Sequence, residues 1–137
     1  MKKNIKKIFT ITGVALALGS ASTAYAANTF TFSFVTNVIG TTEFELRKGN
    51  TTCDSKAYTY KYDTNSYASF IGNYRIDLDG NGVFEPDYTG TYHKADGYMY
   101  TTDYEDIKKN TYTVNVNTNS DLAPRCLQIR GNGEIIQ

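Results

Sequence analysis

Short runs in which aromatic or apolar residues alternate with polar ones constrain the fold of this chain more than any other feature. Residues 28–38 place Phe30, Phe32 and Phe34 at every second position, and residues 56–63 repeat the pattern with tyrosines. Successive side chains of a β-strand point to opposite faces, so period two predicts strands with one buried face. Similar runs recur at roughly 8–12-residue spacing, separated by Gly, Asn and Asp.

This spacing predicts an all-β fold class. About eight to ten short strands of this kind are typical of an antiparallel β-sandwich, of the jelly-roll or Ig-like type, or alternatively of a small β-barrel. Glycine-containing turns are expected at residues 94–97, as a hairpin, and at residues 131–133, between the last two strands. The one helical expectation is a short turn over residues 103–109, where acidic residues come first and two lysines last.

The first 26 residues have the pattern of a secretory signal peptide. Residues 1–7 are basic, residues 8–19 form an apolar run too short to span a bilayer, and residues 24–26 read Ala-Tyr-Ala. We therefore predict cleavage after residue 26. The product is a single secreted, extracellular β domain, residues 27–137, with no membrane attachment.

Removal of the signal peptide changes the charge of the chain. The whole sequence has 14 basic and 14 acidic residues, but the signal segment contains only basic ones: Lys2, Lys3, Lys6 and Lys7. The secreted domain is therefore mildly acidic, whereas nucleic acid and anionic lipid require a basic surface. The expected partner is an extracellular protein or a glycan, and neither nucleic acid nor a membrane.

The two cysteines, Cys53 and Cys126, both lie in the predicted secreted domain. An isolated pair in an oxidising compartment most simply forms one disulfide, so a Cys53–Cys126 bond is predicted, with two free thiols as the alternative. Together with the single His93, two cysteines are too few for a four-ligand zinc site.

Residues 77–87, Asp-Leu-Asp-Gly-Asn-Gly-Val-Phe-Glu-Pro-Asp, are the candidate metal site. Calcium prefers oxygen ligands at alternate positions of a short loop that turns at a glycine. The candidate ligands occupy positions 1, 3, 5, 7 and 9: Asp77, Asp79, Asn81, the Val83 carbonyl and Glu85. The pattern resembles the DxDxDG calcium loops of dockerins, propeller blades and bacterial surface domains, which implies Ca²⁺ as a cofactor.

The calcium loop has a competing interpretation as a plain hairpin, because Asp-Gly and Asn-Gly are strong turn signals. The acidic excess favours an ion, since neighbouring carboxylates repel one another without a cation. Tyr88 occupies the twelfth position, where a helix-loop-helix motif has a bidentate Glu. If Ca²⁺ binds, we expect weak affinity and a role in steadying a hairpin.

Tyr58, Tyr60 and Tyr62 share one face of a predicted strand and form a candidate ligand face. An exposed row of this kind stacks on sugar rings or a partner protein. A buried row packs across the sandwich with its hydroxyls at the rim. The absence of Trp, a frequent sugar platform, weakens the carbohydrate interpretation.

In layout and composition the chain loosely resembles small, uncharacterised secreted Tyr/Thr/Asn-rich β proteins of Gram-positive bacteria. We predict a secreted, non-enzymatic β-sandwich that acts as a binding or surface-associated module. The alternative is a secreted antagonist, either a bacteriocin-like toxin or an inhibitor, and the third hypothesis is a carbohydrate-active enzyme. An enzyme is not expected, because His93 is the single histidine and no Ser lies in a Gly-x-Ser-x-Gly setting.

Overall fold

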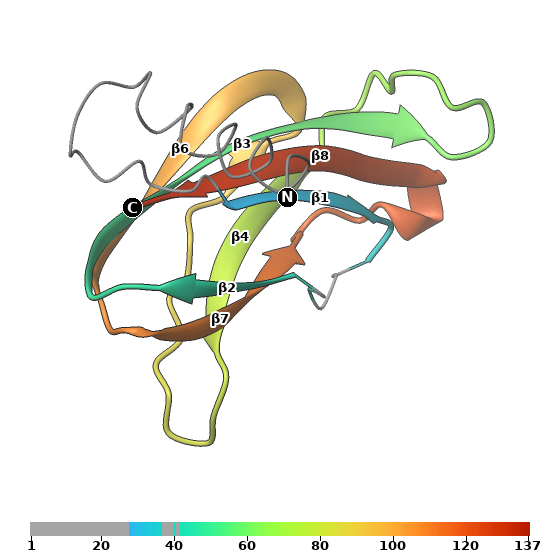
Figure 1. Cartoon of the computed structure of the whole chain (residues 1–137). Coiled ribbons are helices and arrows are strands. Elements are labelled where there is room, and N and C mark those ends of the chain that lie inside the picture. The colour runs from blue at the N-terminus through green and yellow to red at the C-terminus, as the bar shows by residue number, and fades with distance from the viewer. Residues whose placement is uncertain (1–27, 37–39, 41) are drawn as a thin grey trace, which may run out of the picture.

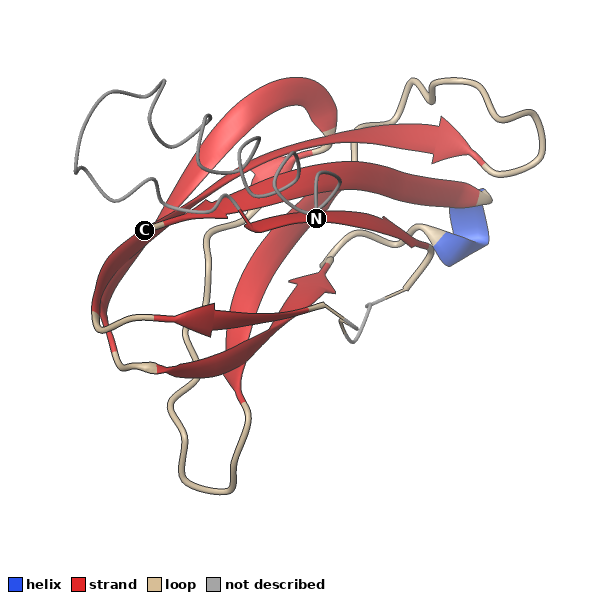
Figure 2. Ribbon diagram, in the orientation of Figure 1, coloured by secondary structure: helices blue, strands red, loops and turns tan. Residues whose placement is uncertain are grey.

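The computed structural model describes residues 28–36, 40 and 42–137, which form two four-stranded antiparallel sheets packed face to face (Figures 1 and 2). The predicted signal peptide lies outside the described residues. Within the described part, no helix is long and apolar enough to cross a membrane. A single 3-10 turn, η1 (Ala123–Arg125), precedes the last strand.

The strands follow the expected alternation and are named in chain order: β1 (Asn28–Phe34), β2 (Glu43–Leu46), β3 (Gly49–Lys61), β4 (Asn73–Gly80), β5 (His93–Lys94), β6 (Asp96–Ile107), β7 (Asn110–Asn117) and β8 (Leu127–Ile136). Sheet A has the order β1-β8-β3-β6 and sheet B the order β2-β7-β4-β5. The pairs are nested, because β1 pairs with β8, β2 with β7, β3 with β6 and β4 with β5. Two sheets of this order form a jelly roll, which confirms the sandwich.

The expected turn at residues 131–133 is wrong, because β8 runs through it without a break. Its glycines face the core and make room for the aromatic rings of β1. A Cβ on Gly131 would lie 2.4 Å from Cζ of Phe32 and 2.6 Å from the carbonyl oxygen of Lys56. A Cβ on Gly133 would lie 2.4 Å from Cζ of Phe30. These glycines are packing positions rather than turn residues.

Two buried tyrosines connect the sheets by hydrogen bonds through the core. The Tyr74 hydroxyl of β4 lies 3.0 Å from Oγ of Ser55 in β3. The Tyr104 hydroxyl of β6 donates to the carbonyl oxygen of Ile76 in β4 at 2.7 Å. Burial raises the pKa of Tyr74 to about 12, so its hydroxyl keeps its proton at neutral pH.

Two further expectations are wrong, both because the chain crosses between sheets. Residues 103–109 are not helical, since β6 continues to Ile107 with Asp106 in the left-handed region at φ 50°. Residues 94–97 do not close a hairpin: β5 pairs with β4 in sheet B, whereas β6 pairs with β3 in sheet A.

Candidate functional site

Strand β3 determines where the predicted ligand face lies. Its inward positions hold buried residues that are mostly small: Thr51, Cys53, Ser55, Ala57 and Thr59. Because side chains alternate along a strand, Tyr58 and Tyr60 point away from the core. The structure therefore places these tyrosines on the outer face of sheet A, and it excludes the interpretation in which they pack across the sandwich.

Three tyrosine rings gather on this outer face. Tyr60 stacks on Tyr67 with ring centroids 5.1 Å apart, and Tyr58 lies 5.2 Å from Tyr67 and 6.3 Å from Tyr60. Reduced access of water and a hydrogen bond with Tyr67 raise the pKa of Tyr60. We call Tyr58, Tyr60 and Tyr67 the tyrosine platform. The predicted third member, Tyr62, lies one residue beyond the end of β3 and is 62 % exposed.

A pocket of about 300 Å³ opens beside the tyrosine platform at the edge of sheet A. At this point the segment that pairs with β3 changes. The Thr59 N–H donates to the Ala95 carbonyl oxygen, whereas the Thr59 carbonyl oxygen accepts from the N–H of Ala68. Its walls combine aromatic rings, small apolar side chains and one carboxylate: Tyr58, Thr59, Tyr67, Ala68, Ile71, Ala95 and Asp96. We call this cavity the edge pocket.

Asp96 is the one ionisable carboxylate of the edge pocket, and two neighbours hold it in place. Its Oδ1 accepts the backbone N–H of Tyr98 at 3.1 Å, and its Oδ2 accepts the Tyr100 hydroxyl at 2.9 Å. Gly97 follows with φ 86°, and a Cβ there would lie 2.2 Å from Cε1 of Tyr58. The glycine therefore allows the Tyr58 ring to lie directly against the backbone of β6.

Two cations lie over the platform rings. The Arg130 guanidinium is 4.8 Å from the Tyr60 ring centroid, and the Lys56 ammonium is 5.4 Å from that of Tyr58. Arg130 is further oriented by Gln128, which accepts its Nε–H at 2.9 Å, and by the side chain of Asn65. The surroundings of the platform are thus positive toward β8 and negative at Asp96.

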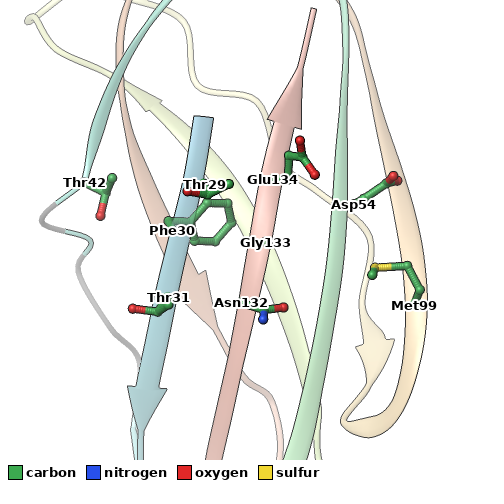
Figure 3. Close-up of a pocket in the computed structure, with 9 residues that line it drawn as sticks. All are labelled: Thr29, Phe30, Thr31, Thr42, Asp54, Met99, Asn132, Gly133 and Glu134. Atoms are coloured by element: carbon green, nitrogen blue, oxygen red, sulfur yellow. The ribbon is translucent and has the colours of Figure 1, made fainter. Parts of the chain in front are cut away.

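A larger hollow of about 550 Å³ lies further along the same face (Figure 3). Threonine, asparagine and carboxylate side chains line most of it: Thr29, Phe30, Thr31, Thr42, Asp54, Met99, Asn132, Gly133 and Glu134. Asp54 and Glu134 face each other across β3 and β8, and Asp54 accepts the Thr101 hydroxyl at 2.5 Å. This polar trough and the edge pocket share the outer face of sheet A.

The first two predicted calcium ligands, Asp77 and Asp79, lie within β4 of sheet B, and the other three lie in the loop that follows. Both carboxylates of β4 already accept hydrogen bonds from protein donors. Asp77 pairs with Arg75 at 2.9 Å and accepts the Gly90 N–H and the Asn117 amide. Asp79 accepts the Asn115 amide at 3.1 Å. The acidic excess is thus balanced by Arg75 and by amides of β7.

The remaining calcium candidates do not converge on one point either. Asn81 donates to Glu43 and accepts from Thr113, while the Val83 side chain is 92 % exposed at the loop. Among the described residues, no group of three or more His, Cys, Asp or Glu side chains could hold a metal ion, so Glu85 belongs to no such group. Calcium binding stays a prediction, and the hairpin interpretation accounts for the observed bonds.

The carboxylate pair Asp79 and Asp87 makes the calcium prediction testable. A hydrogen bond with Asp87, followed by reduced hydration, raises the pKa of Asp79. A carboxyl group whose pKa is raised in the folded state contributes stability below its unfolded pKa. This contribution is lost as the pH rises through its folded pKa. At pH 7 the two carboxylates therefore repel, and a cation between them relieves the repulsion. With a Kd of ~10⁻⁴–10⁻³ M, 10 mM Ca²⁺ adds about 1.4–2.7 kcal/mol of stability at pH 7, measured by thermal melting.

The control for this prediction is the Asp79→Asn variant, which keeps the side-chain size. It should melt at or above the wild-type temperature without calcium, and calcium should not raise its melting temperature. Below pH 3 the wild-type response should also disappear, because the Asp79 carboxyl, whose pKa is raised, is then protonated. An equal calcium response in the variant would contradict the prediction.

The predicted Cys53–Cys126 disulfide is wrong, because both cysteines are free. Cys53 faces Ile135 in the β3–β8 ladder, whereas Cys126 directly precedes Leu127, which faces Lys61. Positions 53 and 61 of one strand are roughly 26 Å apart at ~3.3 Å per residue. A disulfide requires Cα atoms within about 7 Å, so the strand register excludes the bond.

The two thiols are expected to differ sharply in reactivity. Burial raises the pKa of Cys53 to about 12, whereas Cys126 is exposed. Because the thiolate is the reactive form, iodoacetamide at pH 8 should modify Cys126 alone in the folded protein and both cysteines in urea. Mass spectrometry counts the adducts, and Cys126→Ser should give none when folded. If neither cysteine reacted and the pair proved to be oxidised, the result would support the Cys53–Cys126 disulfide.

His93, the single histidine, is half-buried. Its Nε2 lies 2.7 Å from Oγ1 of Thr102, and its ring stacks on Tyr100 with centroids 4.8 Å apart. Burial lowers the pKa of His93. The side chain therefore has a packing role beside the core.

Tyr67, Asp96 and Arg130 were missed by reasoning from the sequence. Each belongs to a different segment, and the fold of sheet A brings them beside β3. Only Tyr67 had a usable signal: the Asp-Thr-Asn run at residues 63–65 forms a turn, with Asn65 at φ 53°, that returns the chain along β3.

No protein-family model matches this sequence, and no curated protein matches it. A Yersinia pseudotuberculosis-derived mitogen is 14 % identical over 80 % of this chain and 86 % of its own, with a TM-score of 0.38. A family two carbohydrate esterase from Cellvibrio japonicus is 12 % identical over 80 % of this chain and 33 % of its own, with a TM-score of 0.29.

Proposed function

We propose that this chain is a secreted, non-enzymatic binding module and that the tyrosine platform with the edge pocket is its ligand-binding face. One observation carries the proposal: three aromatic rings cluster on the solvent side of a strand whose core side holds mostly small residues. Aromatic side chains usually contribute their large apolar area to a core. Exposed clusters of this kind mark binding surfaces.

The surroundings of the platform extend the apolar surface. Ile71 is 51 % exposed, Tyr67 65 %, and Tyr98 71 %. Ile71 and Tyr67 line the edge pocket, and the backbone N–H of Tyr98 donates to the Asp96 carboxylate of that pocket. Their exposed area is available to a ligand without any rearrangement of the core.

Two of the three platform tyrosines, Tyr58 and Tyr60, stand on a strand with neighbours on both sides, which favours binding. Strand β3 pairs on both sides, with β6 and with β8, and Gly97 fixes the position of the Tyr58 ring. A tyrosine has few rotatable bonds, so ordering it on binding costs little entropy. A face built in this way binds with little change of shape.

Cell-surface binding tests this proposal. The protein, secreted from its full chain and labelled with a fluorophore, is titrated onto intact Gram-positive bacteria and onto cultured epithelial cells. We expect saturable binding to at least one of them and a loss of at least tenfold in the double variant Tyr58→Ser/Tyr67→Ser. Phe84→Ser, at a side chain 97 % exposed in the loop after β4, is the matched control.

Two results would overturn the proposal. The first is the absence of saturable binding to either cell type. The second is binding that the double variant retains while Phe84→Ser abolishes it, because the loop after β4 would then be the binding face. Growth of the bacteria is followed in the same wells, and its arrest would identify the binding module as an antagonist.

A further inference from the structure

Resting on that proposed function, we propose that the edge pocket binds one neutral pyranose ring of a glycan. The sugar ring stacks its C–H face on Tyr67 with its edge against the tilted ring of Tyr58, and two adjacent hydroxyl groups donate hydrogen bonds to the carboxylate of Asp96. The polar trough on the same face receives the neighbouring sugar units.

The volume of the edge pocket suits a single sugar unit. Its 300 Å³ corresponds to about ten water molecules at ~30 Å³ each, which is room for one sugar ring with its hydroxyls and a few waters. A pocket of this size lies at the lower end of ligand sites, which span about 300–1,000 Å³. The site is therefore a subsite for one unit rather than a groove for a folded partner.

The hydrogen-bonding capacity of Asp96 fits a pair of hydroxyl donors. An ionised carboxylate accepts about four hydrogen bonds, and Tyr98 and Tyr100 supply one to each oxygen. One further acceptor position remains on each oxygen. Two adjacent sugar hydroxyls match that arrangement, and the existing bonds hold the carboxylate in a fixed orientation.

Charges of both signs surround the platform, so a ligand of a single charge that covers both the rings and the edge pocket meets a like charge at one of them. Arg130 and Lys56 already lie over the rings of Tyr60 and Tyr58, so a cationic side chain of a partner protein would meet two positive charges. An anionic group in the edge pocket would meet the carboxylate of Asp96. A neutral ligand that is apolar on one face and hydroxylated at its edge satisfies both conditions.

The strand register shows how a longer glycan continues. Arg130, Tyr58 and Asp96 form one row across β8, β3 and β6, and Asn132, Lys56 and Met99 form the next. The second row lies at the polar trough, with Thr31 beyond it on β1. Amide and hydroxyl groups of this row provide hydrogen bonds for units on either side of the stacked one.

An array of neutral and acidic oligosaccharides tests the inference directly. We expect binding to neutral glycans with unsubstituted adjacent hydroxyls. Tyr67→Ala should weaken that binding at least tenfold, whereas Tyr67→Phe should retain it because the ring remains. Asp96→Asn should weaken it about tenfold, since an amide offers one acceptor oxygen in place of two. Phe84→Ser should bind as the wild type does.

Periodate treatment separates this inference from the proposed function, because periodate cleaves adjacent diols of glycans on the cell surface. Loss of platform-dependent cell binding after treatment supports the glycan. Platform-dependent binding that survives periodate, together with an empty array, overturns the glycan in favour of a protein ligand and leaves the proposed function standing. Cell binding that never depended on the platform overturns both.

Discussion

Replacing Gly131 with valine is expected to lower the free energy of unfolding by about 3 kcal/mol or more. Overpacking a core typically costs 1–3 kcal/mol, and here the added Cβ meets the Lys56 carbonyl oxygen at 2.6 Å as well as the Phe32 ring. A backbone atom cannot move aside as a side chain does. Urea unfolding followed by circular dichroism measures the loss.

The neighbouring position supplies the control. Asn132 points outward from the same strand, so Asn132→Val should change stability by no more than about 0.5 kcal/mol. If Gly131→Val does not fold, Gly131→Ala provides the smaller step within the same series. Equal stability of Gly131→Val and Asn132→Val would show that these glycines are turn residues after all.

The second large effect is expected at Tyr74, which with Tyr112 is the largest fully buried side chain among the described residues. Its ring lies 5.5 Å from that of Phe32, and its hydroxyl reaches Ser55 across the core. Tyr74→Ala should therefore cost about 3–5 kcal/mol, as large aromatic truncations do. Tyr74→Phe should cost about 0.5–1.5 kcal/mol, because only the hydrogen bond is removed.

Comparing the urea unfolding midpoints of these two variants separates the contribution of packing from that of the hydrogen bond. The comparison requires that the dependence of the unfolding free energy on urea concentration is the same in both. A Ser55→Ala variant tests the bond from the opposite side and should match Tyr74→Phe. A Tyr74→Phe loss as large as that of Tyr74→Ala would mean that the hydroxyl, rather than the ring, holds the sheets together at this point.

The fold class could be predicted because period two is a local property. Strands such as β1 and β7 alternate between core and solvent as their sequences indicate. Turn residues were less reliable, since a glycine serves equally as a turn and as space beneath an aromatic ring. Gly131 and Gly133 have the second role only because β1 lies beside β8, although Phe32 and Gly131 are 99 positions apart in the chain.

The candidate site was predictable in part for the same reason. Tyr58 and Tyr60 share a face by alternation, so their grouping follows from the sequence. Asp96 and Arg130 reach them through the register of β6 and β8, for which no local pattern exists. The cysteine pair was mispredicted because it too depends on register, which places the thiols at opposite ends of a ladder.

The stretch from Asp77 in β4 into the following loop shows how one residue spacing fits two structures. Alternating Asp and Asn residues present oxygens to an ion, but the same oxygens here accept amides from Asn115 and Asn117 of β7. Those donors lie more than thirty positions further along the chain. Only the pairing of β4 with β7 distinguishes a polar ladder from an ion-binding loop.

The nested pairing of the strands has a consequence for how the chain reaches its fold. Asn28 at the start of β1 faces Ile135 near the end of β8, so the first strand finds its partner only after nearly the last residue is synthesised. Contacts between such distant positions form slowly, because closing long loops costs entropy before the contacts compensate. The β1–β8 and β3–β8 pairs of sheet A therefore form only after β8 has been synthesised, whereas β3 and β6 are complete earlier.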